Sequence, residues 1–318
     1  MTRQAKAYIA LVFICIAWGT TYLAIRVGVL HYPPFLFAGI RQLVAGIILV
    51  AIGCMVNRNT GLNKQAVIRQ MIMGLLMLTI GNGGVTWAEK YIPSGIAALL
   101  CSLMPIFAVL FNLLSSGKEK LNAAIGFGML LGFCGVGLIF RQNISDLTNP
   151  QYLGGIAGIL IATSGWALGS TLNKRHGKAL NPLFNSGMQL AFGGVFMLII
   201  SPVADDLTGF RLWNTDGLLA LLYLIIFGSV LAYAAYMYVL DVLPVGIATI
   251  YAYINPLIAV LAGYLFLQEV LNIYIGLAFV TILVSVFLVN RGYRQQHKAD
   301  KQSGNAAVAF PEDIPAES

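Results

Sequence analysis

The sequence predicts an all-α integral membrane protein whose ten transmembrane helices form two inverted repeats of five helices each. Three observations support this prediction: an apolar composition, a series of long apolar segments, and motifs that recur in the second half. Of the 318 residues, 58% are hydrophobic and 10% are charged, against about 45–50% and about 25% in soluble domains. Because so few charges cannot cover the surface of a folded chain this long, the composition excludes water-soluble classes.

Ten apolar segments precede a polar C-terminal stretch. Each has about 20 residues, enough for one membrane crossing, and is apolar all round, unlike the short alternating segments of transmembrane strands. Their approximate bounds are 7–27, 34–56, 69–89, 93–115, 121–140, 153–173, 183–203, 217–239, 244–267 and 271–290. Residues 291–318 are polar, begin basic and end acidic, and are predicted to form a disordered cytoplasmic tail.

Basic residues are unequally divided between the two sets of loops. With the N-terminus in the cytoplasm, fourteen Lys and Arg residues fall on the cytoplasmic side, four on the other side, and Arg41 within a span. This bias predicts a multi-pass inner-membrane protein with both termini cytoplasmic. It also accounts for the formal net charge of +7 without a nucleic-acid partner.

Several motifs recur between the two halves. The stretch 93–97 aligns with 244–248, and the frame Glu-x-Leu-Asn-x-x-Ile-Gly occurs at 119–126 and at 269–276. Upstream, an offset of 148 places Trp18, Pro34, Arg41 and Gly46 on Trp166, Pro182, Gln189 and Gly194. Residues 1–147 and 148–290 are therefore predicted to be two repeats, and five spans per repeat turn the second upside down. Such inverted repeats are typical of secondary transporters, whose sites lie near the midplane between the halves.

The duplicated motifs resemble those of the EamA family of the drug/metabolite transporter superfamily. The residues that carry the resemblance are 17–19, Arg41, 91–100, Pro105 and 119–121 in the first half, and 165–167, 244–248, 255–256 and 268–269 in the second. The resemblance covers about residues 8 to 290. It implies ten helices in two inverted repeats and transport of small metabolites, with export of amino acids or related compounds in many members. The substrate does not follow from it, because members differ widely in cargo.

Arg41 is the leading candidate for substrate binding. It lies seven residues after Pro34, or about 10 Å into its span. A charge at that depth normally faces a partner or a wet cavity, so Arg41 is a candidate counter-charge for a substrate carboxylate. The alternatives are snorkelling to the interface and a structural pair with Glu89. Gln189 keeps a polar group at the repeat-related position.

Other polar and aromatic residues inside the spans are further candidates for the substrate site. Trp18 and Trp166 are either cavity walls or packing residues, and Thr20 either binds a ligand or bonds its own backbone. Polar side chains at helical spacing form two repeat-related stripes, which predict a cavity lining or interhelical hydrogen bonds. These stripes are Asn82, Thr86 and Glu89 in one half and Ser229, Tyr233 and Tyr236 in the other.

Two prolines near the middle of their spans are candidate hinges. Pro105 and Pro256 each remove a backbone hydrogen bond, and Ser102 and Asn255 beside them are candidate binding residues. The alternative is a fixed kink that shapes the bundle. Glu119 and Glu269 each precede a predicted helix and are expected to cap it.

The sequence also restricts which energy sources could drive transport and which functions other than transport are possible. Without a Walker A pattern, direct ATP drive is not expected. Glu89 is the candidate coupling residue for a proton gradient, with exchange or facilitated diffusion as alternatives. No metal or cofactor motif occurs, and the chain lacks signs of a membrane enzyme. A receptor or scaffold without transport activity is the remaining alternative. Expected partners are a small-molecule substrate and the lipid bilayer, and GxxxG spacings such as Gly128–Gly132 leave a homodimer open.

Overall fold

The computed structural model describes residues 2–56, 63–104, 106–108, 110–111, 122–142, 149–176, 181–211, 213–243 and 251–302. Within these ranges it contains helices and connecting segments but no strand. The all-α part of the prediction is therefore confirmed for the described residues. Pro105, Glu119 and the motif 244–248 lie outside the described residues.

The helices follow the predicted apolar segments. They are α1 (Arg3–Val29), α2 (Pro34–Val56), α3 (Lys64–Met73), η1 (Gly74–Gly83), α4 (Gly84–Ala88), α5 (Ser94–Cys101), α7 (Ala123–Gln142), α8 (Pro150–His176), α9 (Pro182–Ala204), α10 (Thr215–Tyr223), η4 (Leu224–Leu231), α11 (Ala232–Val242), α13 (Tyr251–Leu267) and α14 (Ile273–Gln302). Six continuous helices in the described ranges are long and apolar enough to cross a membrane, and four shorter apolar helices overlap the other predicted segments. The count of ten crossings stays a prediction.

Local sequence explains where several helices begin. Pro34, Pro150 and Pro182 occupy first helical positions, where the missing proline N–H costs nothing and its fixed φ suits the helix. Asn63, Asn181 and Asn214 each precede a helix and accept a main-chain N–H with the side-chain oxygen. These caps replace hydrogen bonds that the first helical turn cannot make internally.

Helices α2 and α9 pack through glycines. A Cβ placed on Gly46 would lie 2.8 Å from the carbonyl oxygen of Gly187, and one on Gly39 would lie 3.2 Å from that of Gly194. Only glycine allows the two backbones to approach this closely. Gly39 and Gly46 correspond to Gly187 and Gly194 at the repeat offset of 148. Exchanging the two halves therefore turns the Gly39–Gly194 contact into the Gly46–Gly187 contact.

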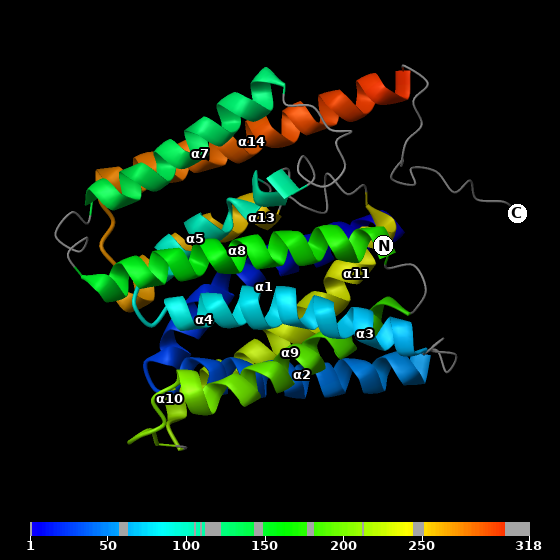
Figure 1. The fold of residues 1–318 in the computed structure, drawn as a ribbon, viewed down its shortest axis with the longest axis vertical. Helices are drawn as coiled ribbons and strands as arrows, with labels where there is room; N and C mark the ends of the chain where they lie inside the picture. Colours follow the sequence, from blue (N-terminus) through cyan, green and yellow to red (C-terminus); the bar gives the residue numbers. More distant parts are fainter. Residues whose placement is uncertain are drawn as a thin grey trace, which may run out of the picture.

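Helices α7 and α14 form a second closely packed pair, and the repeat offset exchanges its contacts as well. Figure 1 shows this pair along one side of the bundle and the α2–α9 pair along the opposite side. The Ser285 hydroxyl donates to the carbonyl oxygen of Gly128 at 2.6 Å, and a Cβ on Gly135 would lie 3.5 Å from the carbonyl oxygen of Ala278. An offset of 150 converts Gly128 and Gly135 into Ala278 and Ser285.

Two spans change their winding near the middle. Both η1 and η4 are π-helical segments, each continuous with α-helices on both sides. They fall in the third and eighth predicted segments, which correspond in the repeat. Because π-helical turns in α-helices are frequent at functional sites, these segments mark the centre of the bundle for attention.

The last helix extends into the predicted tail. α14 continues to Gln302, so residues 291–302 are helical where disorder was expected. This stretch contains several good helix formers and prolongs a helix already nucleated within the bundle. Residues 303–318 lie outside the described residues.

Candidate functional site

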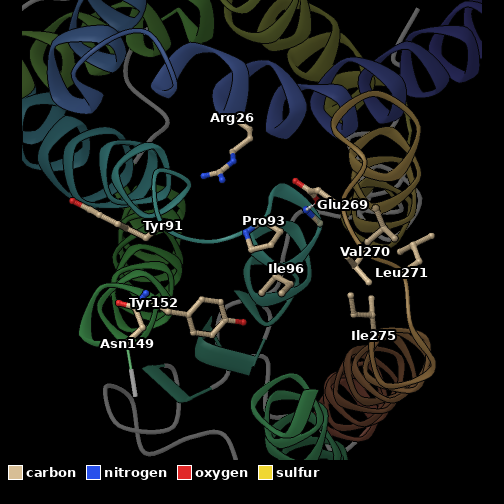
Figure 2. Close-up of a pocket in the computed structure, with 12 residues that line it drawn as sticks. Arg26, Tyr91, Pro93, Ile96, Asn149, Tyr152, Glu269, Val270, Leu271 and Ile275 are labelled. Carbon is tan, nitrogen blue, oxygen red and sulfur yellow. Dashed lines mark hydrogen bonds between the residues drawn. The ribbon is translucent and has the colours of Figure 1, made fainter. Parts of the chain in front are cut away.

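A cavity of about 350 Å³ lies at what we call the distal end of the bundle, where α1 and α4 finish and α5, α8 and α14 begin. Its polar lining comes from α1, from the start of α8 and from the connections before α5, α8 and α14, with the side chains of Arg26, Tyr91, Asn149, Tyr152 and Glu269. Figure 2 shows Arg26 reaching from α1 toward this space, with Tyr152 of α8 on its other side. The cavity therefore has charged and polar side chains among its apolar lining.

Glu269 closes one wall of the cavity and caps α5. Its carboxylate accepts hydrogen bonds from Ser94 N at 2.8 Å, Ser94 Oγ at 2.7 Å and Gly95 N at 3.1 Å. Gln268, with a left-handed φ of 54°, turns the chain after α13 so that Glu269 N reaches the Gly263 carbonyl. The predicted capping role holds, but the capped helix is α5, while the side chain of Asn272 caps α14.

Glu89 lies at the end of α4 and is fully buried, with an exposed fraction of 0%. Neither carboxylate oxygen has a hydrogen-bond partner. The guanidinium of Arg26 donates instead to the main-chain carbonyl oxygen of Glu89. A buried carboxylate without partners is costly, so this residue is the least satisfied acid among the described residues.

Arg41 lies within α2 with an exposed fraction of 4%, which excludes snorkelling to the interface. Its Nε donates to Ser229 Oγ of η4 at 3.1 Å, and its NH1 has no hydrogen-bond partner. The predicted structural pair with Glu89 is not formed as a direct hydrogen bond or ion pair between these two described residues. The guanidinium therefore has donors available in the interior.

Trp18 is the centre of an aromatic cluster. Its ring centroid lies 4.8 Å from that of Tyr251, 5.2 Å from Tyr236 and 6.1 Å from Tyr233, and its Nε1 donates to the carbonyl oxygen of Gly228 at 3.0 Å. Trp166 packs correspondingly against Gly81 of η1. Each repeat-related tryptophan therefore contacts the π-helical segment of the other half.

Two amide pairs bridge neighbouring helices. Gln42 Nε2 donates to Asn82 Oδ1 at 2.8 Å, and Gln189 Nε2 donates to Gln70 Oε1 at 2.7 Å. Asn82 and Gln189 therefore have protein partners, which favours the interhelical hydrogen bonds considered for this stripe.

Four other predicted binding residues have main-chain carbonyls as hydrogen-bond partners. Thr20 Oγ1 donates to the Ile16 carbonyl at 2.7 Å and contacts Tyr223 OH at 2.6 Å. Thr86 Oγ1 and Ser102 Oγ donate to carbonyls of the preceding turn at 2.9 and 2.7 Å. Asn255 is buried next to Pro256, and with its side-chain amide turned so that oxygen and nitrogen exchange places, the nitrogen donates to the carbonyls of Cys15 and Tyr251 at 3.2 and 2.9 Å. Pro256 lies inside α13.

Several residues of this region were missed by the sequence reasoning. Arg26 and the cavity residues Tyr91, Asn149 and Tyr152 lie near span ends, where polar residues are ordinary. Gln42 and Gln70 have roles that depend on which helices become neighbours. Tyr91 and Glu269 did carry a signal, because both lie in the stretches that resemble the EamA family.

Several known proteins resemble this chain over most of its length. The model of the EamA-like transporter family matches twice, at residues 5–141 and 153–291. The uncharacterized inner membrane transporter YedA of Escherichia coli K12 is 35% identical over 89% of this chain and 90% of its own length. Protein PecM of Dickeya dadantii is 31% identical over 80% and 82%, and the uncharacterized transporter YvbV of Bacillus subtilis is 25% identical over 93% and 95%.

A solved crystal structure has the same fold. It aligns with a TM-score of 0.63 and 19% identity over 92% of this chain and 98% of that one. Together with the apolar helices, these relatives identify a multi-pass membrane transporter, which fits a protein that is not an enzyme.

Proposed function

Because the chain belongs to the EamA-like transporter family, we propose that it is a secondary permease of the inner membrane for small organic metabolites, namely amino acids or related compounds. Export is the direction that the family resemblance favours. The observation that carries the proposal is the buried, incompletely bonded Arg41 inside a chain of this family. A charged group at that depth normally marks a substrate or ion pathway.

The proposed architecture is ten membrane-spanning helices in two inverted repeats, residues 1–147 and 148–290. Its support comes from the two separate family matches and from contacts that the repeat offset exchanges, such as Gly39 with Gly194 and Gly46 with Gly187. Two contacts that map onto each other in this way are expected where a pseudo-twofold axis passes between two helices. Both termini are proposed to be cytoplasmic, which makes the distal end the outer end.

Transport is proposed to proceed by alternating access. The two halves would exchange conformations, so that the interior opens in turn at each end. Arg41, together with Ser229 of η4, would contact the substrate, while Trp18, Tyr233 and Tyr236 would shape its surroundings. The amides and hydroxyls that already have protein partners, such as Gln189 and Thr20, would hold helices in place. Pro256 would serve as a hinge only if α13 bends between the two states.

Coupling is assigned to Glu89. A carboxylate that is buried without partners is suited to bind and release a proton, which would let the proton gradient drive transport. The neighbouring charged groups are Arg26, Arg41 and Glu269.

The test is a flux assay with the purified chain in liposomes. A panel of labelled amino acids is followed with and without a pH gradient, beside an Arg41→Ala protein and an Arg211→Gln control in the exposed loop after α9. Saturable flux of at least one compound, lost in Arg41→Ala and kept in Arg211→Gln, is the expected result.

Three other results would each change the proposal. Full flux in Arg41→Ala would make Arg41 structural. Flux without any response to the pH gradient would remove the coupling role of Glu89. No flux of any amino acid, other metabolite or drug-like cation above empty liposomes would reject the permease.

A further inference from the structure

The guanidinium of Arg41 lies against one short stretch of η4. Its Nε donates to Ser229 Oγ at 3.1 Å, and its NH2 lies 3.2 Å from the place that a Cβ on Gly228 would occupy. Both Arg41 and Ser229 are buried. The direction of this charge, which is carried by α2, therefore depends on two consecutive residues in the second half of the chain.

The main chain at Gly228 is fixed in turn by α1. Trp18 Nε1 donates to the carbonyl oxygen of Gly228 at 3.0 Å. One turn further along α1, the Thr21 hydroxyl donates to the carbonyl oxygen of Trp18 at 2.6 Å. The Cγ2 of Thr21 lies 2.8 Å from the place of a Cβ on Gly228. A side chain at position 228 would therefore displace Thr21 or Arg41.

The winding of η4 gives the bond from Trp18 its importance. η4 is π-helical, and its hydrogen bonds span one residue more than those of an α-helix. A shift of one residue corresponds to about 100° of rotation around a helix axis. A return of this segment to α-helical winding would therefore turn Ser229 away from its present direction. Trp18 opposes such a change because it bonds a carbonyl oxygen within the segment, directly before Ser229.

The second half of the chain has a related contact without the charge. Trp166 packs against η1, where a Cβ on Gly81 would lie 3.1 Å from Trp166 Cε3. At the position that corresponds to Arg41, Gln189 donates to Gln70 of α3 at 2.7 Å. Contact between a tryptophan and a π-helical segment is therefore common to both repeats. In the first case the π-helical segment also bonds a buried charge.

We propose that Trp18 and Gly228 are positioning residues for Arg41. The indole of Trp18 fixes the Gly228 carbonyl, and the missing side chain at Gly228 lets the guanidinium lie against the main chain. Ser229 then occupies Nε, which leaves the unpartnered NH1 as a donor for an anionic group of the substrate. This role rests on the proposed substrate contact of Arg41. It assigns to Trp18 an action through Arg41 instead of direct contact with the substrate.

The test measures how flux depends on concentration in matched variants. The proteins are reconstituted in liposomes, with the labelled amino acid or other metabolite that the wild type carries. Trp18→Phe removes the indole N–H and keeps an aromatic ring, while Gly228→Ala crowds the guanidinium. Each should raise the half-saturation concentration about fivefold or more, which corresponds to one lost hydrogen bond. The maximal rate should stay within about twofold of wild type, since binding alone is weakened.

The equivalent changes at the Trp166–Gly81 contact are the matched controls. Trp166→Phe and Gly81→Ala alter a tryptophan and a glycine of a π-helical contact in the same way, but on the side of the repeat that carries Gln189. They should leave the half-saturation concentration at the wild-type value. If Trp18→Phe does not fold, Gly228→Ala tests the same link with the aromatic cluster intact.

A double-mutant cycle shows whether Trp18 acts through Arg41. Arg41→Lys keeps the charge but lacks the Nε donor and the planar fork. Adding Trp18→Phe to Arg41→Lys should therefore change the half-saturation concentration by less than about twofold. A tryptophan that contacts the substrate itself, or only stabilises the fold, would give the same fold-change in both backgrounds. If Arg41→Lys carries no flux, the shift of its thermal midpoint caused by the same compound measures binding instead.

Different results would reject this role and the proposed function. An unchanged half-saturation concentration in Trp18→Phe and Gly228→Ala, an equal rise in Trp166→Phe, or an undiminished effect in Arg41→Lys would reject positioning and leave a permease. Full flux in Arg41→Ala would remove the substrate contact on which the role rests. The absence of saturable flux for every compound would reject the permease itself.

Discussion

Glu269 and Glu89 lie near the same end of the molecule and are used in opposite ways. Glu269 is partly buried and accepts three hydrogen bonds from the first residues of α5. Glu89 is completely buried and accepts none through its side chain. A carboxylate that is fully satisfied by the protein joins two parts of the chain, whereas one left unsatisfied is available to something that enters from outside.

Arg41 and Gln189 show a similar contrast between the two repeats, because one has an unbonded donor and the other has a protein partner. They occupy positions that correspond at an offset of 148, and both are buried. Gln189 donates to Gln70 at 2.7 Å, while Arg41 keeps NH1 without a partner. The repeat therefore supplies a common frame, and the charge that needs a ligand is present in only one half.

The largest effect on stability is expected from Glu269→Ala. Loss of the carboxylate leaves Ser94 N, Ser94 Oγ and Gly95 N without acceptors and removes the cap of α5, which should lower the free energy of unfolding by about 3 kcal/mol. Thermal unfolding of the detergent-solubilised protein measures this loss of stability. Glu269→Gln, which keeps one acceptor oxygen, should lose about half as much. An unchanged midpoint in Glu269→Ala would contradict a structural role.

Glu89→Gln should behave differently in the same experiment. No hydrogen bond to the side chain is lost, so the free energy of unfolding should change by less than about 1 kcal/mol. Flux of the transported amino acid should nevertheless fall about tenfold or more. A stability loss as large as that of Glu269→Gln would remove the distinction between the two acids.

Gln189→Leu tests the contrast between Arg41 and Gln189. This change leaves Gln70 without its amide donor in the interior and should lower the free energy of unfolding by about 1–2 kcal/mol. Flux of the transported compound should stay at the wild-type value, as measured in proteoliposomes. Reduced flux would mean that both halves contribute to substrate binding.

The helices were predictable because membrane crossing requires long apolar segments, and α1, α2, α8 and α9 follow the predicted bounds closely. Arg41 could be singled out because a charge inside an apolar span is conspicuous in one dimension. The partners were not predictable in this way. Whether Glu269 caps α5 or α14, and whether Gln42 meets Asn82, depends on which helices become neighbours. The π-helical winding of η1 and η4 likewise depends on tertiary packing, and glycines such as Gly81 and Gly228 are too common here to indicate it.

The smallest effect is expected at an acid in the exposed loop after α9. The pKa of Asp206 lies below its usual value because the hydroxyl and the main-chain N–H of Thr208 donate to its carboxylate, at 2.6 and 2.9 Å. A lowered pKa means that Asp206 adds stability above the usual value of about 3.9, which is lost as the pH falls through the lower folded pKa. Thr208→Val should raise this pKa toward the usual value in an NMR titration. It should leave transport unchanged, because this exposed acid is bonded by Thr208 of its own loop and contributes neither to substrate binding nor to the α5 cap. Altered flux in Thr208→Val would show that exposed charge at the distal end takes part in transport, and the contrast between Glu269 and Glu89 would then be incomplete.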